Sequence, residues 1–236
     1  MMRHWTAALC ALGLAAALVW AGSTPVTAQG AGSIVGEVKF SGTPPAARTL
    51  KVNKDTQVCG SDRPSEELVV GANKGIKNAV VSLGGAKGPA PKPAQKPALD
   101  QKGCQFTPHV LVVPAGAEMD ILNSDGILHN IHTFSSANAS INKAQPKFKK
   151  VMTEKFDKPE IIKVQCDVHG WMQGWIVIGA HAAYAVSDDS GAFKLDNVPP
   201  GKHKVEVWHE TLGKLSQEVE VKAGAPTKVT FEMSKK

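Results

Sequence analysis

The sequence predicts an all-β protein, and three features of its 236 residues support this fold class. Short runs that alternate apolar and polar residues recur after Ala28, as expected for half-buried strands. Gly, Pro, Asn and Asp residues bound these runs, which is typical of turns between strands. The same part of the sequence lacks the 3.6-residue apolar repeat that marks a helix packed on a core.

The first 28 residues have the order of a secretory signal. A charged start at Arg3 is followed by an apolar run from Trp5 to Trp20 and by the small-residue end Val26-Thr27-Ala28. We expect cleavage after Ala28 and a periplasmic or otherwise exported protein. The apolar run is short for a membrane span, so an uncleaved N-terminal anchor is the alternative. Cleavage leaves about 208 residues, enough for one large or two small domains.

Two strands are predicted before a Pro-rich connector. Residues 33–40 alternate and end at the turn 42–45, and residues 77–83 form a second apolar run. Residues 88–97 contain four prolines among small and basic residues and have no means of burying a core. This connector marks either a domain boundary or a long loop within one domain.

The middle of the chain continues with strands. Residues 109–113 and 118–123 flank Pro114-Ala115-Gly116, which predicts a hairpin. Residues 160–165 and 174–178 alternate on either side of a seven-residue loop. Two adjacent strands would hold that loop rigidly.

The loop between them contains a thiolate, an imidazole and a thioether in Cys166, His169 and Met172. This combination suits copper; zinc is the rival ion, but Met is a poor zinc ligand. A trigonal copper site needs a second imidazole, and the stretch 128–132 offers His129 and His132. In the alternative interpretation the Cys is buried, the Met fills a core gap and the His lies at the surface.

The pair His129-Asn130-Ile131-His132, followed by Cys-x-x-His-x-x-Met, resembles the ligand pattern of the cupredoxins, with a loop length similar to that of the amicyanins. The resemblance covers roughly residues 105–179 and implies a Greek-key β-sandwich with one copper ion. The implied ligands are His129, Cys166 and His169 in the equatorial plane and Met172 in the axial position. Asn130 is implied to join the two ligand segments by a hydrogen bond. Val168 departs from the pattern, since many cupredoxins have Pro there.

The same resemblance implies single-electron transfer and a solvent-facing edge of His169. A transient redox partner, such as a c-type cytochrome or a dehydrogenase, is expected to dock at that edge. His132 lies three residues after His129, so in a strand the two side chains point to opposite faces, and we expect His132 not to be a ligand. His109 has no evident partner in the sequence and is interpreted as structural.

The remaining cysteines of the mature chain are Cys59 and Cys104. If Cys166 binds copper, these two are left as a pair in an oxidising compartment, and we expect a disulfide between them. The alternative is two buried free thiols.

The last part of the chain resembles the carboxypeptidase regulatory-like β-sandwich. The resemblance rests on Asp188 to Phe193, which contain a D-x-x-G-x-F pattern, and on Pro199-Pro200-Gly201 before an alternating strand at 204–208. The opening strands of such a sandwich match residues before the connector. Our hypothesis is a second sandwich built from residues 30–87 and 181–236, with the copper domain, residues 98–180, inserted between its halves.

The chain carries a net charge of +6. Several of its lysines lie between the two ligand segments: Lys143, Lys147, Lys149, Lys150 and Lys155. They predict a basic rim that steers an acidic partner, or else a solvated loop. Stacking aromatics are not interleaved with these lysines, so nucleic acid binding is not expected.

The sequence contains no G-x-S-x-G, H-E-x-x-H or phosphate-binding glycine loop. We therefore expect an electron-transfer protein that is not an enzyme. Two other functions stay open: a copper carrier or sensor without electron transfer, and a scaffold whose metal site is structural.

Overall fold

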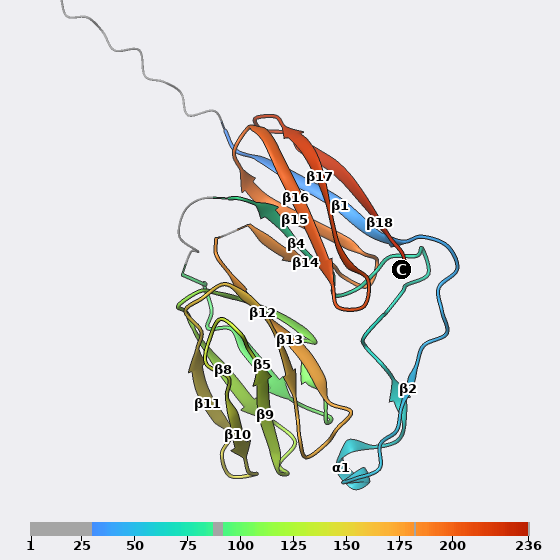
Figure 1. The fold of residues 1–236 in the computed structure, drawn as a ribbon, viewed down its shortest axis with the longest axis vertical. Helices are drawn as coiled ribbons and strands as arrows, with labels where there is room; N and C mark the ends of the chain where they lie inside the picture. The colour runs from blue at the N-terminus through green and yellow to red at the C-terminus, as the bar shows by residue number, and fades with distance from the viewer. Residues whose placement is uncertain (1–29, 87–91, 182, 236) are drawn as a thin grey trace, which may run out of the picture.

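The computed structural model describes residues 30–86, 92–181 and 183–235. These residues form strands β1 to β18 and one four-residue helix, arranged as two β-sandwiches (Figure 1), which confirms the all-β class. The expected signal segment, residues 1–28, lies outside the described residues. Within the described part, no helix has the length and apolar character needed to cross a membrane.

The first sandwich, called the terminal sandwich here, is built from both ends of the described chain. One sheet has the order β15-β1-β18 and the other β14-β4-β16-β17. Its strands are β1 (Gly32–Phe40), β4 (Val80–Gly84), β14 (Tyr184–Val186), β15 (Ala192–Val198), β16 (Gly201–His209), β17 (Gly213–Val221) and β18 (Pro226–Met233). Its core includes Ile34, Val38, Val205 and Phe231, each fully buried.

The second sandwich, called the central sandwich, is formed by the chain between β4 and β14. Its sheets have the orders β10-β9-β12-β13-β7 and β11-β8-β5-β6. The strands are β5 (Ala98–Gln101), β6 (Phe106–Thr107), β7 (Val110–Pro114), β8 (Glu118–Asn123), β9 (His129–Phe134), β10 (Asn142–Gln145), β11 (Val151–Lys155), β12 (Glu160–Gln165) and β13 (Gln173–Gly179). Its core contains Ile121, Ile131, Ile162 and Ile176, all fully buried.

The predicted hairpin at residues 114–116 is wrong. β7 pairs with β13 in the five-stranded sheet, whereas β8 pairs with β5 and β11 in the four-stranded sheet. The turn is bonded to other segments: the amide of Ala115 donates to Gly179 and that of Gly116 to Phe156. The chain therefore crosses between the two sheets at this turn, so that each strand buries an apolar face on the opposite side of one core.

Four short strands, β5, β6, β10 and β11, were not predicted because they are polar or only two to five residues long. Part of the expected connector, residues 87–91, lies outside the described residues. The rest, residues 92–97, has no strand and leads directly into β5.

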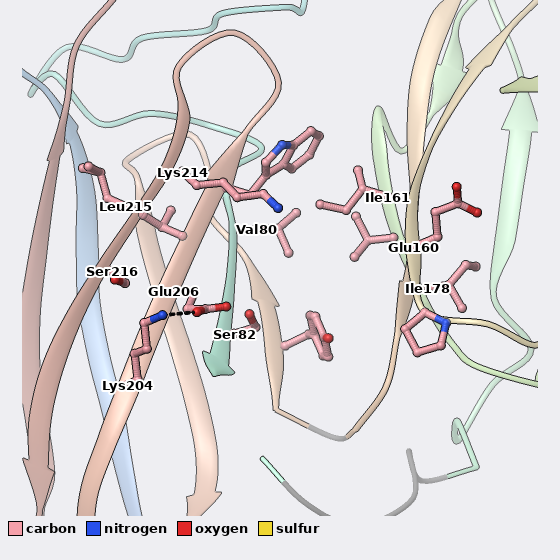
Figure 2. A pocket seen from close by; sticks show the side chains of 15 residues that line it. Val80, Ser82, Glu160, Ile161, Ile178, Lys204, Glu206, Lys214, Leu215 and Ser216 are labelled. Atoms are coloured by element: carbon pink, nitrogen blue, oxygen red, sulfur yellow. Dashed lines mark ion pairs between the residues drawn. The ribbon is translucent and has the colours of Figure 1, made fainter. Parts of the chain in front are cut away.

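A small apolar cluster joins the two sandwiches. Val80 of the terminal sandwich is buried with Val110 and Val177 of the central one. Beside them the rings of Trp175 and Trp208 meet edge to face, with centroids 5.0 Å apart. Figure 2 shows the open groove at this junction, with Ile161 facing Val80 across it. An ion pair between Lys204 and Glu206 lies on its terminal-sandwich side.

A long connection from β1 to β4 leaves the terminal sandwich and reaches the far end of the central one (Figure 1). We call residues 45–68 the arm; it contains β2 (Thr49–Leu50), α1 (Thr56–Cys59) and β3 (Arg63–Pro64). Val52 and Cys59 are buried in the core of the central sandwich. Our domain hypothesis assigned the arm to the sandwich built from residues 30–87 and 181–236, the terminal sandwich, but these buried residues of the arm pack on the central one.

A pH dependence is expected from His209, the last residue of β16. The side chain is 1% exposed, and this burial lowers its pKa to about 4. In the unfolded chain the pKa is about 6.5, so acid protonates the unfolded state first. Stability should therefore fall as the pH drops from about 6.5 to 4, by a total of about 3 kcal/mol.

Urea unfolding of the wild type and of His209→Gln across this pH range measures the effect. The variant cannot take up the proton, so its stability should vary less with pH. Parallel pH profiles for the two proteins would show that His209 does not carry the dependence.

Candidate metal centre

The predicted loop leaves β12 and returns as β13. Gln165, the last residue of β12, pairs with Gln173, the first residue of β13. Residues 166–172 therefore form the loop that connects these two strands. Inside it, the amide of Cys166 donates to the carbonyl of Met172 at 3.2 Å, and the amide of Met172 donates to that of His169 at 2.8 Å. These bonds fold the loop back on itself and bring its three candidate donors to one end of the sandwich.

β9 delivers the second imidazole. It pairs with β12 from Lys163 to Gln165, so its first residues continue beside the start of the loop. His129 is the first residue of β9 and is fully buried, while His132 has 29% of its side chain exposed. The two histidines therefore point to different environments, and His129 is the one that faces the loop.

Three donor atoms meet inside this end of the core. The Sγ atom of Cys166 lies 3.9 Å from Nδ1 of His129 and 3.7 Å from Nδ1 of His169. The two Nδ1 atoms are 3.0 Å apart. All three side chains are at most 1% exposed. Together they form a compact triangle of one sulfur and two nitrogens.

The dimensions of the triangle fit a metal ion. A point equidistant from the three atoms lies about 2.1 Å from each, close to the metal–nitrogen and metal–sulfur lengths of about 2.0 and 2.3 Å in protein sites. Two imidazole nitrogens that face each other with lone pairs repel unless a cation or a proton lies between them. The donor set of one thiolate and two imidazoles is that of a trigonal copper site.

Each imidazole is held from behind by a carboxylate. Nε2 of His129 lies 2.9 Å from Oδ2 of Asp125, and Nε2 of His169 lies 2.9 Å from Oδ2 of Asp55. Burial lowers the pKa of His129, which favours the neutral ring. The hydrogen bond from His169 lowers the pKa of Asp55 and keeps it ionised. A proton on each Nε2 leaves both Nδ1 atoms free to bind a metal.

Asn130 joins the two ligand segments. Its Oδ1 accepts from the amide of Asp167 at 2.5 Å, and its Nδ2 donates to Asn142 and to the Asp167 carboxylate at 2.7 and 3.3 Å. His132 contacts the same carboxylate at 3.1 Å. This hydrogen bond is the main reason that the pKa of Asp167 is lowered. His132 therefore contacts the Cys166 loop through Asp167, on the side away from the three donor atoms.

Met172 follows His169 by three residues in the same loop, and its side chain is 2% exposed. It belongs to the buried cluster that also contains Cys166. Trp171 is partly exposed; its ring centroid lies 5.2 Å from that of His169, and its Nε1 donates to the carbonyl of Cys104. Val168, where many cupredoxins have Pro, also packs against this cluster.

The expected solvent-facing edge of His169 is wrong, because the side chain is fully buried. The arm covers it: Asp55 precedes α1 and holds the outer nitrogen of the ring. Asp55 and His169 are 114 residues apart in the sequence, so no local sequence pattern could have predicted their contact.

The predicted disulfide between Cys59 and Cys104 is present, which leaves Cys166 as the free cysteine of the described residues. The disulfide links α1 to the loop before β6. A sulfur of this disulfide lies within 4.8 Å of donor atoms of both histidines. Because both sulfurs are in the covalent bond, they are neighbours of the centre and add no thiolate to it.

Asp125, four residues before His129, was not predicted to take part in the centre. The structure places it 6% exposed, with its carboxylate accepting from the amides of Gly103 and Cys104 at 2.5 and 2.8 Å as well as from His129. A carboxylate four residues before a candidate ligand was the available signal. Asn123 holds the same loop, since its Nδ2 donates to the carbonyl of Ile127.

The other histidine left as structural, His109, lies away from the three donors. It is buried at the junction of the sandwiches and bonds through Nε2 to Glu210 of the terminal sandwich.

The lysines between the two ligand segments differ in their surroundings. Lys143 and Lys155 form ion pairs with Glu154 and Asp157, whereas Lys147 and Lys149 are exposed in the turn between β10 and β11.

Comparisons with known proteins give structural likenesses and no sequence match: neither a family model nor a curated protein matches this chain. The structure is similar to a purple cupredoxin from Nitrosopumilus maritimus, with 18% identity and a TM-score of 0.31 over 36% of this chain and 100% of that one. It is similar to the Cu(I) form of a single-site mutant of amicyanin, with 17% identity and a TM-score of 0.33 over 42% and 98%. A copper-containing nitrite reductase from Thermus scotoductus SA-01 has 23% identity and a TM-score of 0.32 over 40% of this chain, which spans 24% of that enzyme. Each likeness is confined to less than half of this chain.

Removal of Asn130 should loosen the centre. In Asn130→Ala the amide of Asp167 loses its acceptor, so the Cys166 loop is no longer held against β9. We expect Cu(II) affinity to fall by about 10- to 100-fold, the usual effect of removing a partner that orients metal ligands. Competition with a chromophoric chelator measures this change.

Asn142→Ala is the matched control. It removes a neighbouring amide that donates to the Asp167 carboxylate and accepts from Nδ2 of Asn130, but it leaves the bond from the Asp167 amide to Oδ1 of Asn130 intact. Its affinity should stay near that of the wild type, and equal losses in both variants would contradict the role given to Asn130.

Proposed function

We propose that the central sandwich holds one copper ion in a type 1 site and that the protein transfers single electrons between redox partners. The observation that carries this proposal is the buried triangle formed by Cys166 Sγ and the Nδ1 atoms of His129 and His169. Met172, buried in the same loop, would supply a thioether as a further ligand. Bound copper would supply a one-electron couple.

The protein's own contribution is rigidity. The loop between β12 and β13, the Asn130 bridge and the two carboxylates hold the donors before any metal binds. A preformed trigonal arrangement leaves little to move between the two oxidation states, which favours fast electron transfer. Burial of all three donors excludes water from the centre. The same burial disfavours the alternative of a carrier that hands its copper to another protein.

Electrons need a contact between the buried centre and a partner. Trp171 is partly exposed and its ring lies against His169, so it connects the centre with the surface. We propose a transient partner of the c-type cytochrome or dehydrogenase kind, in an exported compartment. An electron carrier of this kind needs no catalytic residues of its own.

The turn between β10 and β11 supports electrostatic steering of that partner. It begins after Gln145, which pairs with His129 across the sheet. Lys147 and Lys149 flank Phe148, whose side chain is 81% exposed. A cationic surface beside the centre raises the encounter rate with an anionic partner, and salt screens this effect.

A copper titration tests the site. Addition of one equivalent of Cu(II) should give an intense visible thiolate-to-copper band and a narrowed copper hyperfine splitting in the EPR spectrum. Cys166→Ser should abolish both, and His129→Ala should change them. His132→Ala is the control and should keep them. A colourless protein that binds zinc or Cu(I) instead would contradict the proposal.

The lysines are tested with a small anionic oxidant. The double variant Lys147→Glu/Lys149→Glu should react more slowly than the wild type with hexacyanoferrate(III) at low ionic strength, and the difference should shrink in about 1 M salt, where the screening length is about 3 Å. Stopped-flow absorbance measures the rate.

Lys202→Glu/Lys222→Glu, which makes the same charge change at exposed positions of the terminal sandwich, is the control. An equal slowing in both double variants would assign the effect to net charge alone.

A further inference from the structure

The arm brings a carboxylate to the outer side of a candidate metal ligand. Oδ2 of Asp55 lies 2.9 Å from Nε2 of His169. The His169 side chain is fully buried, whereas 31% of the Asp55 side chain remains exposed. Asp55 therefore stands between the imidazole and solvent.

The backbone of Asp55 is suited to this position. Its φ and ψ angles are 50° and 37°, a left-handed conformation that Asp, Asn and Gly adopt more readily than other residues. In this conformation its carbonyl accepts from the amides of Val58 and Cys59, both at 2.9 Å, and starts α1. The side chain is left free to turn toward His169.

Several contacts hold the arm against the central sandwich. The disulfide joins Cys59 to Cys104, and the guanidinium of Arg63 donates to the carbonyls of Gly103 and Cys59. Val52 is 9% exposed, and its side chain is part of the core of the central sandwich. A covalent bond, a buried side chain and polar contacts together fix the position of Asp55 relative to His169.

We propose that Asp55 is a positioning residue of the metal centre and that the arm is its permanent cap. By accepting the Nε2 proton of His169, Asp55 keeps Nδ1 unprotonated and directed at Cys166. The cap also closes the His169 edge to small anions, chelators and partner proteins. This inference rests on the proposed copper site and adds a ligand-orienting residue to it, contributed by the connection from the terminal sandwich.

The first test uses the full-length, metal-free protein. Nitrogen-15 NMR of the imidazole groups should show His169 with its proton on Nε2 in the wild type. Asp55→Gly removes the carboxylate and suits the left-handed backbone, so this preference should be lost. Asp55→Asn keeps an oxygen acceptor and should retain it. Lys54→Ala, an exposed neighbour on the arm, is the control and should match the wild type.

The second test uses the same four proteins loaded with copper. In Asp55→Gly, chelator removal of copper should accelerate and affinity should fall by about 10- to 100-fold. Azide should then shift the visible spectrum of this variant but not of the wild type or Lys54→Ala. Asp55→Asn should behave close to the wild type, because its amide oxygen still fills the space beside His169.

The outcomes separate the two proposals. If wild-type protein forms no thiolate–copper band, the proposed function fails, while the NMR comparison still decides whether Asp55 orients His169. If the band forms but the His169 tautomer and the azide response of Asp55→Gly equal those of the wild type, the inference about Asp55 is overturned. A wild-type His169 protonated on Nδ1 would overturn it as well.

Discussion

The structure depends on the close approach of three lone-pair donors inside a hydrophobic core. One sulfur and two imidazole nitrogens lie 3.0 to 3.9 Å apart with almost no exposure to water. Buried polar atoms in this arrangement are costly unless something satisfies them. A bound cation would satisfy all three at once. The surrounding strands and the arm hold them together.

The residues that hold the candidate ligands in place come from widely separated parts of the chain. Asp125 precedes β9, Asn130 lies on β9, and Asp55 belongs to the arm. The disulfide between Cys59 and Cys104 connects two of these parts, because the amide of Cys104 also donates to Asp125. Orientation of both imidazoles therefore depends on one connected network, which explains how a loop with Val168 in place of Pro can still be held rigidly.

One member of this network, Asp55, comes from the connection between two strands of the terminal sandwich. The arm belongs to the connection between β1 and β4 of the terminal sandwich, but its buried residues Val52 and Cys59 lie in the core of the central one. Trp175 and Trp208 pack against each other at the junction of the two sandwiches, which lie one above the other in Figure 1. The terminal sandwich thus has a structural role at the centre, since its connection delivers Asp55 to His169.

Local patterns in the sequence were sufficient to predict the all-β class, the strands around the loop and the candidate donors Cys166, His169 and Met172, because strand periodicity and the spacing within one loop are properties of neighbouring residues. The choice of His129 over His132 came from the resemblance to the cupredoxins, and the structure brings His129 together with Cys166 and His169. Local patterns also sufficed for the disulfide, since two cysteines remained to pair. They did not predict the crossing of the chain between sheets at residues 114–116, the burial of His169 or the part played by Asp55. Those features depend on which distant segments pack together, and only the tertiary structure decides that.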